Sequence, residues 1–392
     1  MPEDFPQDLI VITDPNEDRY NAFRLISWWE HDVLENARVM VLGAGATGNE
    51  VLKNLALMGV GHILISDFDT IQRANLARSV LFREQDEGLR KADVATKAVK
   101  ELNPDVKVQP FHGDIIYELG LGVYRRMDVV IGCVDSRRAR LAVNQSCWKV
   151  AKPWVDGGLD ALNGQARVYW PGRGACYECT LFEQDYVLME QRNSCQQLAI
   201  KAFMEGRIPT TPTSASIIGA VQAQEAMKIV HGIDVKAGKV FMYDGLLYDA
   251  GWYTLSEREN CPSHWHYEPI VELPNVSHRT TLSDFMRLIH QQTNPEAVVE
   301  LNFDFVTAWE CGICGQSESV MKPKHKLSYE DSLCCGEERL AITTFRLTGD
   351  EAFAQYELGQ IGIPPLEVLR IDIGDGQYAY FELSGDDDFV KF

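Results

Sequence analysis

The first 170 residues alternate between short apolar runs and stretches with helical spacing. The first run, residues 39–42, ends in glycines, and apolar residues then recur at helical spacing from Val51 to Met58, where Gly59 follows. Further strand-like runs lie at residues 62–66, 106–108, 129–131, 154–155 and 166–169. Strands that alternate with helices form a parallel sheet covered by helices on both faces. The pattern therefore predicts an α/β fold with a Rossmann-like, doubly wound, mostly parallel sheet.

The pattern changes after this region. Residues 180–213 have no regular period and contain two prolines, so we expect a long segment that crosses over the domain. A helix at 216–230 and a strand at 240–243 follow, and the chain beyond is rich in β-type sequence apart from one helix at 282–291. These changes divide the chain into an N-terminal helical arm (1–36), an α/β domain (37–268) that contains the crossing segment, and a smaller β-rich domain (269–392).

Composition and charge exclude several classes of protein. The 392 residues are 45% hydrophobic, which is ordinary for a globular chain, and without an apolar run of about 18 residues we expect no membrane span. The 57 acidic side chains exceed the 37 basic ones by 20, which argues against a nonspecific nucleic-acid binder. The first residues lack the regions of a secretion signal, so we expect a cytoplasmic protein.

Two local patterns give further expectations. In the N-terminal arm, residues 25–29 predict a helix. Near the C-terminus, the acidic run 386–388 is expected to be solvated, because a cluster of like charges is usually exposed to water.

A glycine-rich turn joins the first strand to the first helix of the α/β domain. Residues 43–48 have the pattern GxGxxG, in which glycines allow a tight turn and close approach of the backbone to a phosphate. Asp67 ends the next strand, where a carboxylate can meet ribose hydroxyls. The sequence therefore predicts a nucleotide site whose members are Gly43, Ala44, Gly45, Thr47, Gly48 and Asp67.

Polar residues after this turn favour a triphosphate over a dinucleotide. Asp69, Asn75, Arg78 and Lys91 follow Asp67 in sequence, and they are not needed for hydride transfer. Arginine and lysine can neutralise phosphate charge. A carboxylate at the end of another strand, Asp135, can hold Mg²⁺. We therefore expect ATP and Mg²⁺ at this site.

Cysteine pairs predict two zinc sites. Cys176 and Cys179 form one half-site, and Cys261 and His264 form the matching half-site. His266 is a less favoured alternative to His264 as the fourth ligand. A second, weaker pattern contains Cys311, Cys314 and Cys334, and its fourth ligand is left open among Cys335, His325, Glu337 and Glu338. A redox role for the CxxC pair lacks the expected βαβ setting. The smaller domain is therefore expected to carry a zinc-ribbon-like insertion.

A lone cysteine, Cys195, lies in the crossing segment. Arg192, Lys201 and Arg207 are close to it in sequence, and nearby cations lower the pKa of a thiol. Cys195 is therefore the candidate nucleophile, and a free loop cysteine is the alternative.

Residues of about 15 to 268 resemble the superfamily of ubiquitin-activating enzymes and ThiF/MoeB-type adenylyltransferases. The resemblance implies that the α/β domain is an ATP-binding adenylation domain and that Asn75, Arg78 and Lys91 bind phosphates. It also implies a Mg²⁺-linked role for Asp135 and a thioester cysteine in the crossing segment. An N-terminal arginine, Arg24 or otherwise Arg19, would reach the phosphates of a neighbouring subunit, which implies a homodimer.

The resemblance predicts an activating enzyme for a ubiquitin-like protein. Such an enzyme would adenylate the C-terminal glycine of its partner, form a thioester on Cys195 and pass the acyl group to a conjugating enzyme, with the β-rich domain as a partner-docking unit. Three alternatives remain: adenylation of a sulfur-carrier protein without a thioester, a noncatalytic scaffold that binds a ubiquitin-like protein, and an NAD-dependent oxidoreductase.

Overall fold

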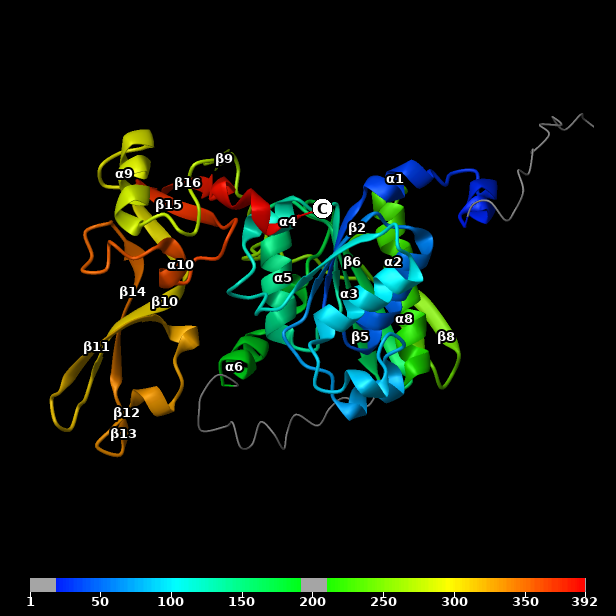
Figure 1. Cartoon of the computed structure of the whole chain (residues 1–392), viewed down its shortest axis with the longest axis horizontal. Helices are drawn as coiled ribbons and strands as arrows, with labels where there is room; N and C mark the ends of the chain where they lie inside the picture. The colour runs from blue at the N-terminus through cyan, green and yellow to red at the C-terminus, as the bar shows by residue number, and fades with distance from the viewer. Residues whose placement is uncertain (1–18, 192–209, 392) are drawn as a thin grey trace, which may run out of the picture.

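The computed structural model describes residues 19–191 and 210–391 (Figure 1). These residues form two main sheets. The first sheet has the strand order β3-β2-β1-β4-β5-β6-β7-β8. Neighbours from β3 to β5 are parallel, whereas β5 to β8 pair antiparallel. The strands are β1 (Arg38–Leu42), β2 (His62–Ser66), β3 (Lys107–Phe111), β4 (Val129–Gly132), β5 (Trp154–Asp160), β6 (Asn163–Tyr169), β7 (Lys239–Asp244) and β8 (Asp249–Thr254).

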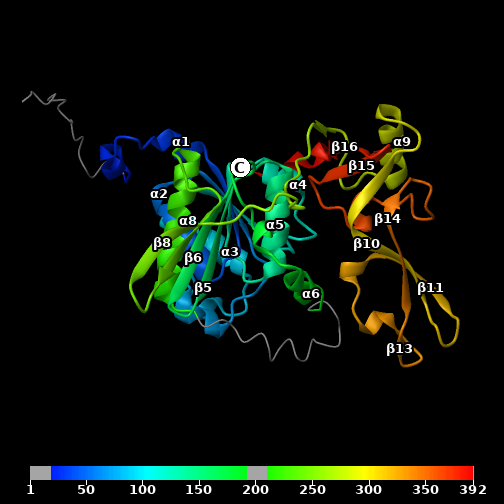
Figure 2. The same ribbon diagram turned by 180° about the vertical axis from the view of Figure 1, so that it is seen from behind.

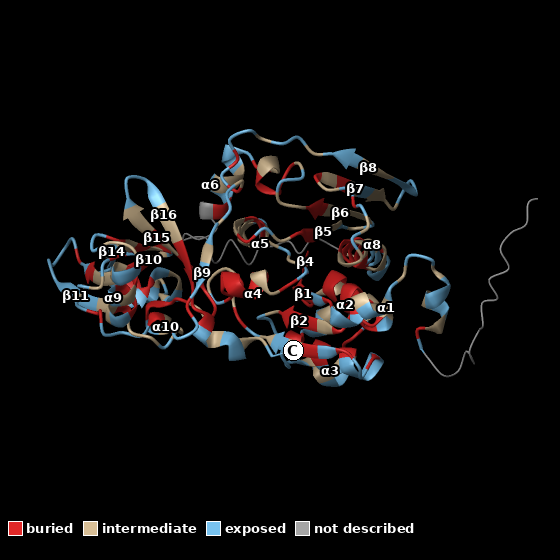
Figure 3. Cartoon of the chain, turned by 90° about the horizontal axis from the view of Figure 1, so that it is seen from above, coloured by how far each residue is buried: buried red, intermediate tan, exposed pale blue. Residues whose placement is uncertain are grey.

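Helices cover both faces of this sheet, as the sequence predicts. Alternate residues of β1 enter two different cores: Val39 and Val41 pack in one, and Met40 and Leu42 pack in the other. The first core includes residues of α2, α3 and α8, and the second includes α4 and α5 (Figure 3). The helices are α1 (His31–Asn36), α2 (Ala46–Met58), α3 (Lys91–Leu102), α4 (Leu121–Arg125), α5 (Arg137–Lys149), α6 (Glu183–Gln191) and α8 (Pro212–Val230). The Rossmann-like, doubly wound fold is thus confirmed.

The strand order reverses between β1 and β4. The chain leaves β1 toward β2 on one side, and β4 pairs with the other side of β1. Ligands of open α/β sheets bind at such a point, outside the carboxyl ends of the strands. The turn after β1 and the loop after β4 both begin there.

Three segments differ from the sequence expectation. The helix expected at 25–29 is replaced by a 3₁₀ helix, η1 (Asn21–Leu25), followed by α1. The crossing segment begins with a helix, α6, which the sequence pattern did not reveal. Helix α8 begins earlier than expected because Thr211 caps it by accepting a hydrogen bond from Ser214 N, and Pro212 suits the first helical position.

The β-rich part contains the second sheet, in the order β11-β10-β15-β16-β9, with β14 also paired to β10 (Figure 2). Its own core packs α9 and α10 against the strands. The elements are β9 (Ile270–Glu272), α9 (Leu282–Gln292), β10 (Val298–Glu310), β11 (Ser317–Pro323), β14 (Leu340–Leu347), α10 (Leu358–Ile361), β15 (Val368–Gly374) and β16 (Gln377–Glu382). A two-stranded ribbon joins β12 (Leu333–Cys334) to β13 (Glu337–Glu338).

Several 3₁₀ helices connect these elements. Besides η1 they are η2 (Arg73–Arg78), η3 (Glu84–Asp86), η4 (Glu178–Thr180), η6 (Lys324–Lys326), η7 (Glu330–Ser332) and η8 (Ser384–Phe389). Among the helices that the structure describes, none is long and apolar enough to cross a membrane.

A buried carboxylate joins the two parts of the chain. Glu382, which is fully buried, pairs with Arg125 and with Arg126, whose Nη1 lies 2.6 Å from Glu382 Oε1. A Cβ on Gly122 would lie 2.5 Å from Leu366 O, so the backbones approach closely at this contact. The two parts are therefore packed tightly against each other through α4.

The acidic run 386–388 is not uniformly solvated, which corrects the sequence expectation. Asp386 accepts hydrogen bonds from His278 N and from the His278 ring, each at 2.7 Å. Asp387 pairs with Arg126 at 2.6 Å. These partners, His278 and Arg126, are more than 100 residues away in the sequence, so the local sequence around the acidic run does not predict them.

We expect Glu382→Gln to lower the free energy of unfolding by about 2 kcal/mol, measured by urea denaturation. The change leaves two arginines without their buried partner, and solvent at the partly exposed guanidinium groups relieves part of that cost. Glu272→Gln is the matched control, because the Glu272 side chain is 60% exposed and pairs with Arg125 at 3.3 Å. Equal stability of the two variants would contradict a structural role for Glu382.

Candidate functional site

The turn between β1 and α2 has no room for a Cβ at two of its glycines. Gly43 has a φ of +98°, and a Cβ there would lie 2.5 Å from Cys133 O. A Cβ on Gly48 would lie 2.0 Å from Gly43 O. At Gly45, by contrast, no atom of the described residues other than Gly45 and its two chain neighbours lies within 4 Å of the Cβ position. The turn is thus packed closely against β4 on one side and open at Gly45, where a ligand can approach its backbone.

A buried side chain, Asn49, and a half-buried one, Asp67, hold this turn. Asn49 donates to Ala44 O at 2.7 Å and to Gly45 O at 3.0 Å, and its Oδ1 accepts from Leu81 N. Asp67 accepts from Ala44 N at 2.7 Å and from Asp69 N at 2.8 Å. Burial raises the pKa of Asp67, and the charge of Lys91 opposes this rise. The carboxylate expected to meet ribose therefore also anchors the turn.

The basic residues predicted for phosphate binding follow Asp67. Lys91 begins α3, is largely buried, and pairs with Asp69 at 2.6 Å. Asn75 and Arg78 lie on η2, where Asn75 Oδ1 accepts from Gln72 N at 2.8 Å. Three residues after Arg78, Leu81 N bonds to Asn49, so this segment is tied to the start of α2.

Asp135 is exposed just beyond the end of β4. It lies two residues after Cys133, whose N donates to Leu42 O at 2.7 Å and whose carbonyl touches Gly43. The loop that carries Asp135 is therefore beside the glycine turn. Ser136 then caps α5 by accepting from Ala139 N.

A buried carboxylate that the sequence analysis missed supports this loop. Asp156, fully buried in β5, accepts from Arg140 Nε and from Arg167 Nη1, each at 2.9 Å. Arg140 also donates to Val134 O at 2.7 Å, next to Asp135. Asp156 ends an apolar run just as Asp67 and Asp135 do, so the same signal could have found it. Asn49 gave no such signal.

The N-terminal arginines lie away from this site. Arg19 donates to Leu102 O, at the last residue of α3, and a Cβ on Gly59 would lie 2.6 Å from Tyr20 Cζ. These contacts place η1 beside the C-terminal ends of α2 and α3. The glycine turn is at the other end of α2, roughly 20 Å away for a helix of 13 residues. Arg24 is exposed on η1. Cys195 lies outside the described residues.

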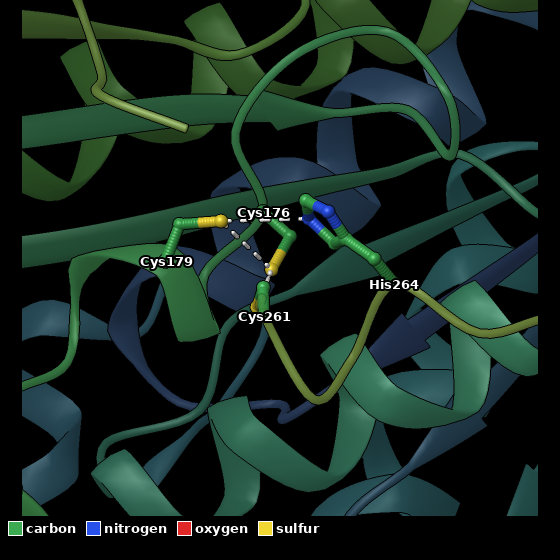
Figure 4. Close-up of side chains that lie close together, drawn as sticks. All are labelled: Cys176, Cys179, Cys261 and His264. Carbon is green, nitrogen blue, oxygen red and sulfur yellow. Dashed lines mark hydrogen bonds between the residues drawn. The ribbon is translucent and has the colours of Figure 1, made fainter. Parts of the chain in front are cut away.

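The first predicted zinc half-sites meet in one cluster (Figure 4). Cys176 Sγ lies 3.7 Å from Cys179 Sγ and 3.5 Å from Cys261 Sγ, and Cys179 Sγ lies 3.4 Å from His264 Nε2. Tetrahedral zinc with bonds of about 2.3 Å places sulfur ligands about 3.8 Å apart, so these side chains fit the ion as they stand. The ring of His264 stacks on Trp148. His266 instead bonds to Trp148 O.

The second cluster resolves the open choice of its fourth ligand. Cys311, Cys314, Cys334 and Cys335 come together, with Cys334 Sγ 3.9 Å from Cys314 Sγ and 3.8 Å from Cys335 Sγ. Backbone N–H groups of Cys314 and Ile313 lower the pKa of Cys311 to about 6, which favours the thiolate that a metal needs.

His325 is excluded from this cluster. Its ring stacks on Tyr117 with a centroid distance of 3.7 Å and meets Phe303 edge-on. It therefore takes part in the contact between the two parts of the chain.

The family profile described as ThiF matches residues 18–263, more than half of the sequence. With the doubly wound sheet and the glycine turn, this match defines the class of protein: the chain belongs to the ThiF family. The matched residues contain the nucleotide-site candidates and the Cys176–Cys179 half-site.

Relatives are similar to this chain over part of their length. An adenylyltransferase and sulfurtransferase MOCS3 of Drosophila persimilis is 32% identical over 54% of this chain and 45% of its own length. SUMO-activating enzyme subunit 2 of Dictyostelium discoideum is 38% identical over 38% of this chain and 22% of its own. The chain thus spans less than half the length of these relatives.

A solved structure has the same fold. Escherichia coli MccB with ATP superimposes with a TM-score of 0.54 and 22% identity, over 65% of this chain and 75% of that one.

Gly45→Ala should weaken binding of ATP at least about tenfold without lowering the melting temperature. The new Cβ meets open space in the protein but would occupy the approach to the turn. Gly48→Ala is the contrasting variant, because its Cβ would clash with Gly43 O and should destabilise the fold. Titration calorimetry with a thermal-melting control measures both. Unchanged ATP affinity in Gly45→Ala would contradict phosphate binding at this turn.

Elemental analysis of the purified protein should find two zinc ions per chain. Cys261→Ala and Cys334→Ala should each leave one ion, because each removes one of four ligands from a different cluster. Cys147→Ala is the control, since Cys147 is buried outside both clusters and its loss should leave two ions. Retention of both ions in Cys261→Ala would show that the first cluster is not a zinc site.

Proposed function

We propose that this protein is an ATP-dependent activating enzyme for a ubiquitin-like protein. The observation that carries the proposal is the convergence of the glycine turn, Asp67 and the Lys91–Asp69 pair where the strand order reverses, with Asp135 beside them. Phosphate donors and carboxylates gathered at one crevice suit a nucleoside triphosphate. A hydride-transfer enzyme does not need this set.

The proposed reaction joins two substrates at this crevice. A C-terminal glycine carboxylate oxygen of the partner attacks the α-phosphorus of ATP, the bond to the bridging oxygen breaks, and pyrophosphate leaves. The turn binds phosphate through its backbone, and Arg78 and Lys91 neutralise the charge that develops on the phosphates. Mg²⁺ held by Asp135 would supply further charge neutralisation. The product is an acyl-adenylate.

The second step assigns Cys195 as the nucleophile. Its thiolate attacks the acyl carbon, AMP leaves, and a thioester forms that a conjugating enzyme can accept. Support comes from the sequence, where Cys195 lies among Arg192, Lys201 and Arg207. The similarity to a SUMO-activating enzyme subunit supports the broader proposal of an activating enzyme. The β-rich domain, residues 269–392, would dock the partner or the acceptor, and we place the enzyme in the cytoplasm.

A homodimer would complete the phosphate site. Arg24 follows Tyr20, which packs at the end of α2 opposite the glycine turn. An arginine so placed is far from its own subunit's turn, so we assign it to the site of a second copy. Arg19, the other candidate, bonds to Leu102 O of its own chain. The two metal clusters are assigned to structural zinc, because each offers four protein ligands and no open position.

A sulfur-carrier pathway is the second candidate function. It shares the adenylation step but has no thioester relay on Cys195. The observation that favours it is the name of a relative, MOCS3, described as both adenylyltransferase and sulfurtransferase.

Mass spectrometry under non-reducing conditions tests the proposal. Incubation with Mg·ATP and a ubiquitin-like protein ending in glycine should give a thiol-sensitive adduct of the two proteins. Cys195→Ala should abolish the adduct but keep ATP–pyrophosphate exchange, because adenylation precedes thiol attack. Cys147→Ala, a buried cysteine outside the metal clusters, is the control and should form the adduct.

The other outcomes separate the alternatives. Pyrophosphate exchange without an adduct would support the sulfur-carrier candidate. Absence of ATP binding would contradict the enzyme itself and leave a scaffold role.

A further inference from the structure

A cavity of about 270 Å³ lies between the two parts of the chain, away from the nucleotide crevice. It is lined by the start of α4, the end of α5, the segment that follows Cys261, residues 300–303 of β10, and residues 363–370 that lead into β15. Its volume is just below the roughly 300 Å³ at which pockets for drug-sized ligands begin. The space therefore suits a molecule about as large as an amino acid.

One ion pair in the wall of this cavity is already complete. Arg370 pairs with Glu300, and Glu300 also accepts from Arg346 at 2.9 Å. The Arg370 guanidinium lies over the ring of Tyr378, 4.6 Å from its centroid. This pair shapes the wall, and its charges are satisfied within the protein.

A second pair of opposite charges in the same wall is not joined. Within the described chain, Lys149 and Glu367 attract each other electrostatically but form no salt bridge. Lys149 Nζ lies 5.5 Å from the ring centroid of Tyr267, and burial lowers its pKa. Glu367 is buried and accepts hydrogen bonds from Val368 N at 2.9 Å and Leu121 N at 3.4 Å, and burial raises its pKa to about 7.

Glu367 keeps its two backbone hydrogen bonds and Lys149 its contact with Tyr267, but within the described residues neither has an opposite charge at ion-pair distance, which is costly for a group shielded from water. A ligand that carries both charges would satisfy the two groups together. Its carboxylate would meet the ammonium of Lys149, and its ammonium would meet the carboxylate of Glu367. This requirement selects a zwitterion over a simple acid or a simple amine.

Aromatic rings form the remaining part of the wall. Trp265 donates to Tyr380 OH at 3.0 Å, and Tyr267 stacks on the same tyrosine at 4.1 Å. Both rings are therefore held in place before a ligand binds, and Phe303 adds a third. Trp265 is 43% exposed, so this side of the wall reaches solvent. Rigid aromatic walls bind an apolar or aromatic group with little loss of conformational freedom.

We propose that this cavity binds a free amino acid with an aromatic side chain, held by Lys149 and Glu367 at its charged end and by Trp265 and Tyr267 at its ring. The site is separate from the nucleotide crevice. Lys149 is the last residue of α5, and Asp135 lies just before this helix begins. Because a helix of 13 residues spans about 20 Å, the two residues are at opposite ends of it. Because the lining comes from both parts of the chain, such a ligand would stabilise their contact.

Titration calorimetry of L-phenylalanine into the full-length protein tests the site. We expect saturable binding that weakens at least about tenfold in Lys149→Met and in Glu367→Gln, the loss of one charge-assisted contact. Two half-ligands, 3-phenylpropanoate and 2-phenylethylamine, should each bind at least about tenfold more weakly than phenylalanine. Glu367→Gln keeps the size of the side chain, so it serves as the test if Lys149→Met fails to fold.

Two control variants separate this site from others. Lys152→Met alters another half-buried lysine just past the end of α5 that does not line the cavity, and it should bind phenylalanine normally. Asp135→Ala should also bind it normally, because the nucleotide crevice is not involved, and Lys149→Met should keep ATP–pyrophosphate exchange. The proposal is overturned if phenylalanine gives no binding at millimolar concentration, if Lys149→Met and Glu367→Gln bind like the native protein, or if 3-phenylpropanoate binds equally well.

Discussion

The nucleotide crevice depends on a steric constraint in the turn after β1. Gly43 and Gly48 have no space for a Cβ, because the turn packs against the Cys133 carbonyl and folds back on itself. This contact brings the ends of β1 and β4 together, so that the residues after both strands share one crevice. Asn49 and Asp67 then bind the turn's carbonyl and N–H groups from either side.

Hydrogen bonds from arginine side chains offset the cost of burying a carboxylate near the crevice. An isolated buried carboxylate would lose several kcal/mol of hydration, so Asp156 is stable only because Arg140 and Arg167 both donate to it. Arg140 uses its remaining donors on Val134 O and Gly157 O. The same arginine therefore neutralises a buried charge and fixes the loop before Asp135. A side chain that contacts no nucleotide can in this way determine where an exposed carboxylate lies.

Local patterns made the fold and most of the crevice predictable. Strand periodicity and the GxGxxG spacing are short-range signals, and both metal-type clusters follow from paired cysteines whose partner halves fit one geometry. Long-range partners were not predictable. The burial of Asp386 depends on His278, 108 residues earlier, and the exclusion of His325 from the second cluster depends on Tyr117. Helix α6 was missed because its apolar residues do not follow one helical face.

The turn from Cys261 to His264 links two features that the sequence presents as separate. Its ends supply ligands to the first cysteine cluster, and its middle residues, Pro262 and Ser263, line the cavity between the two parts. Ser263 is buried and bonds to Asn144 of α5, so the turn cannot move without disturbing that helix. Metal-binding free energy in a small site is also folding free energy for the segment that holds it. Ligation at the cluster would thus order one wall of the cavity, and by linkage a molecule bound there would strengthen the ligation in return.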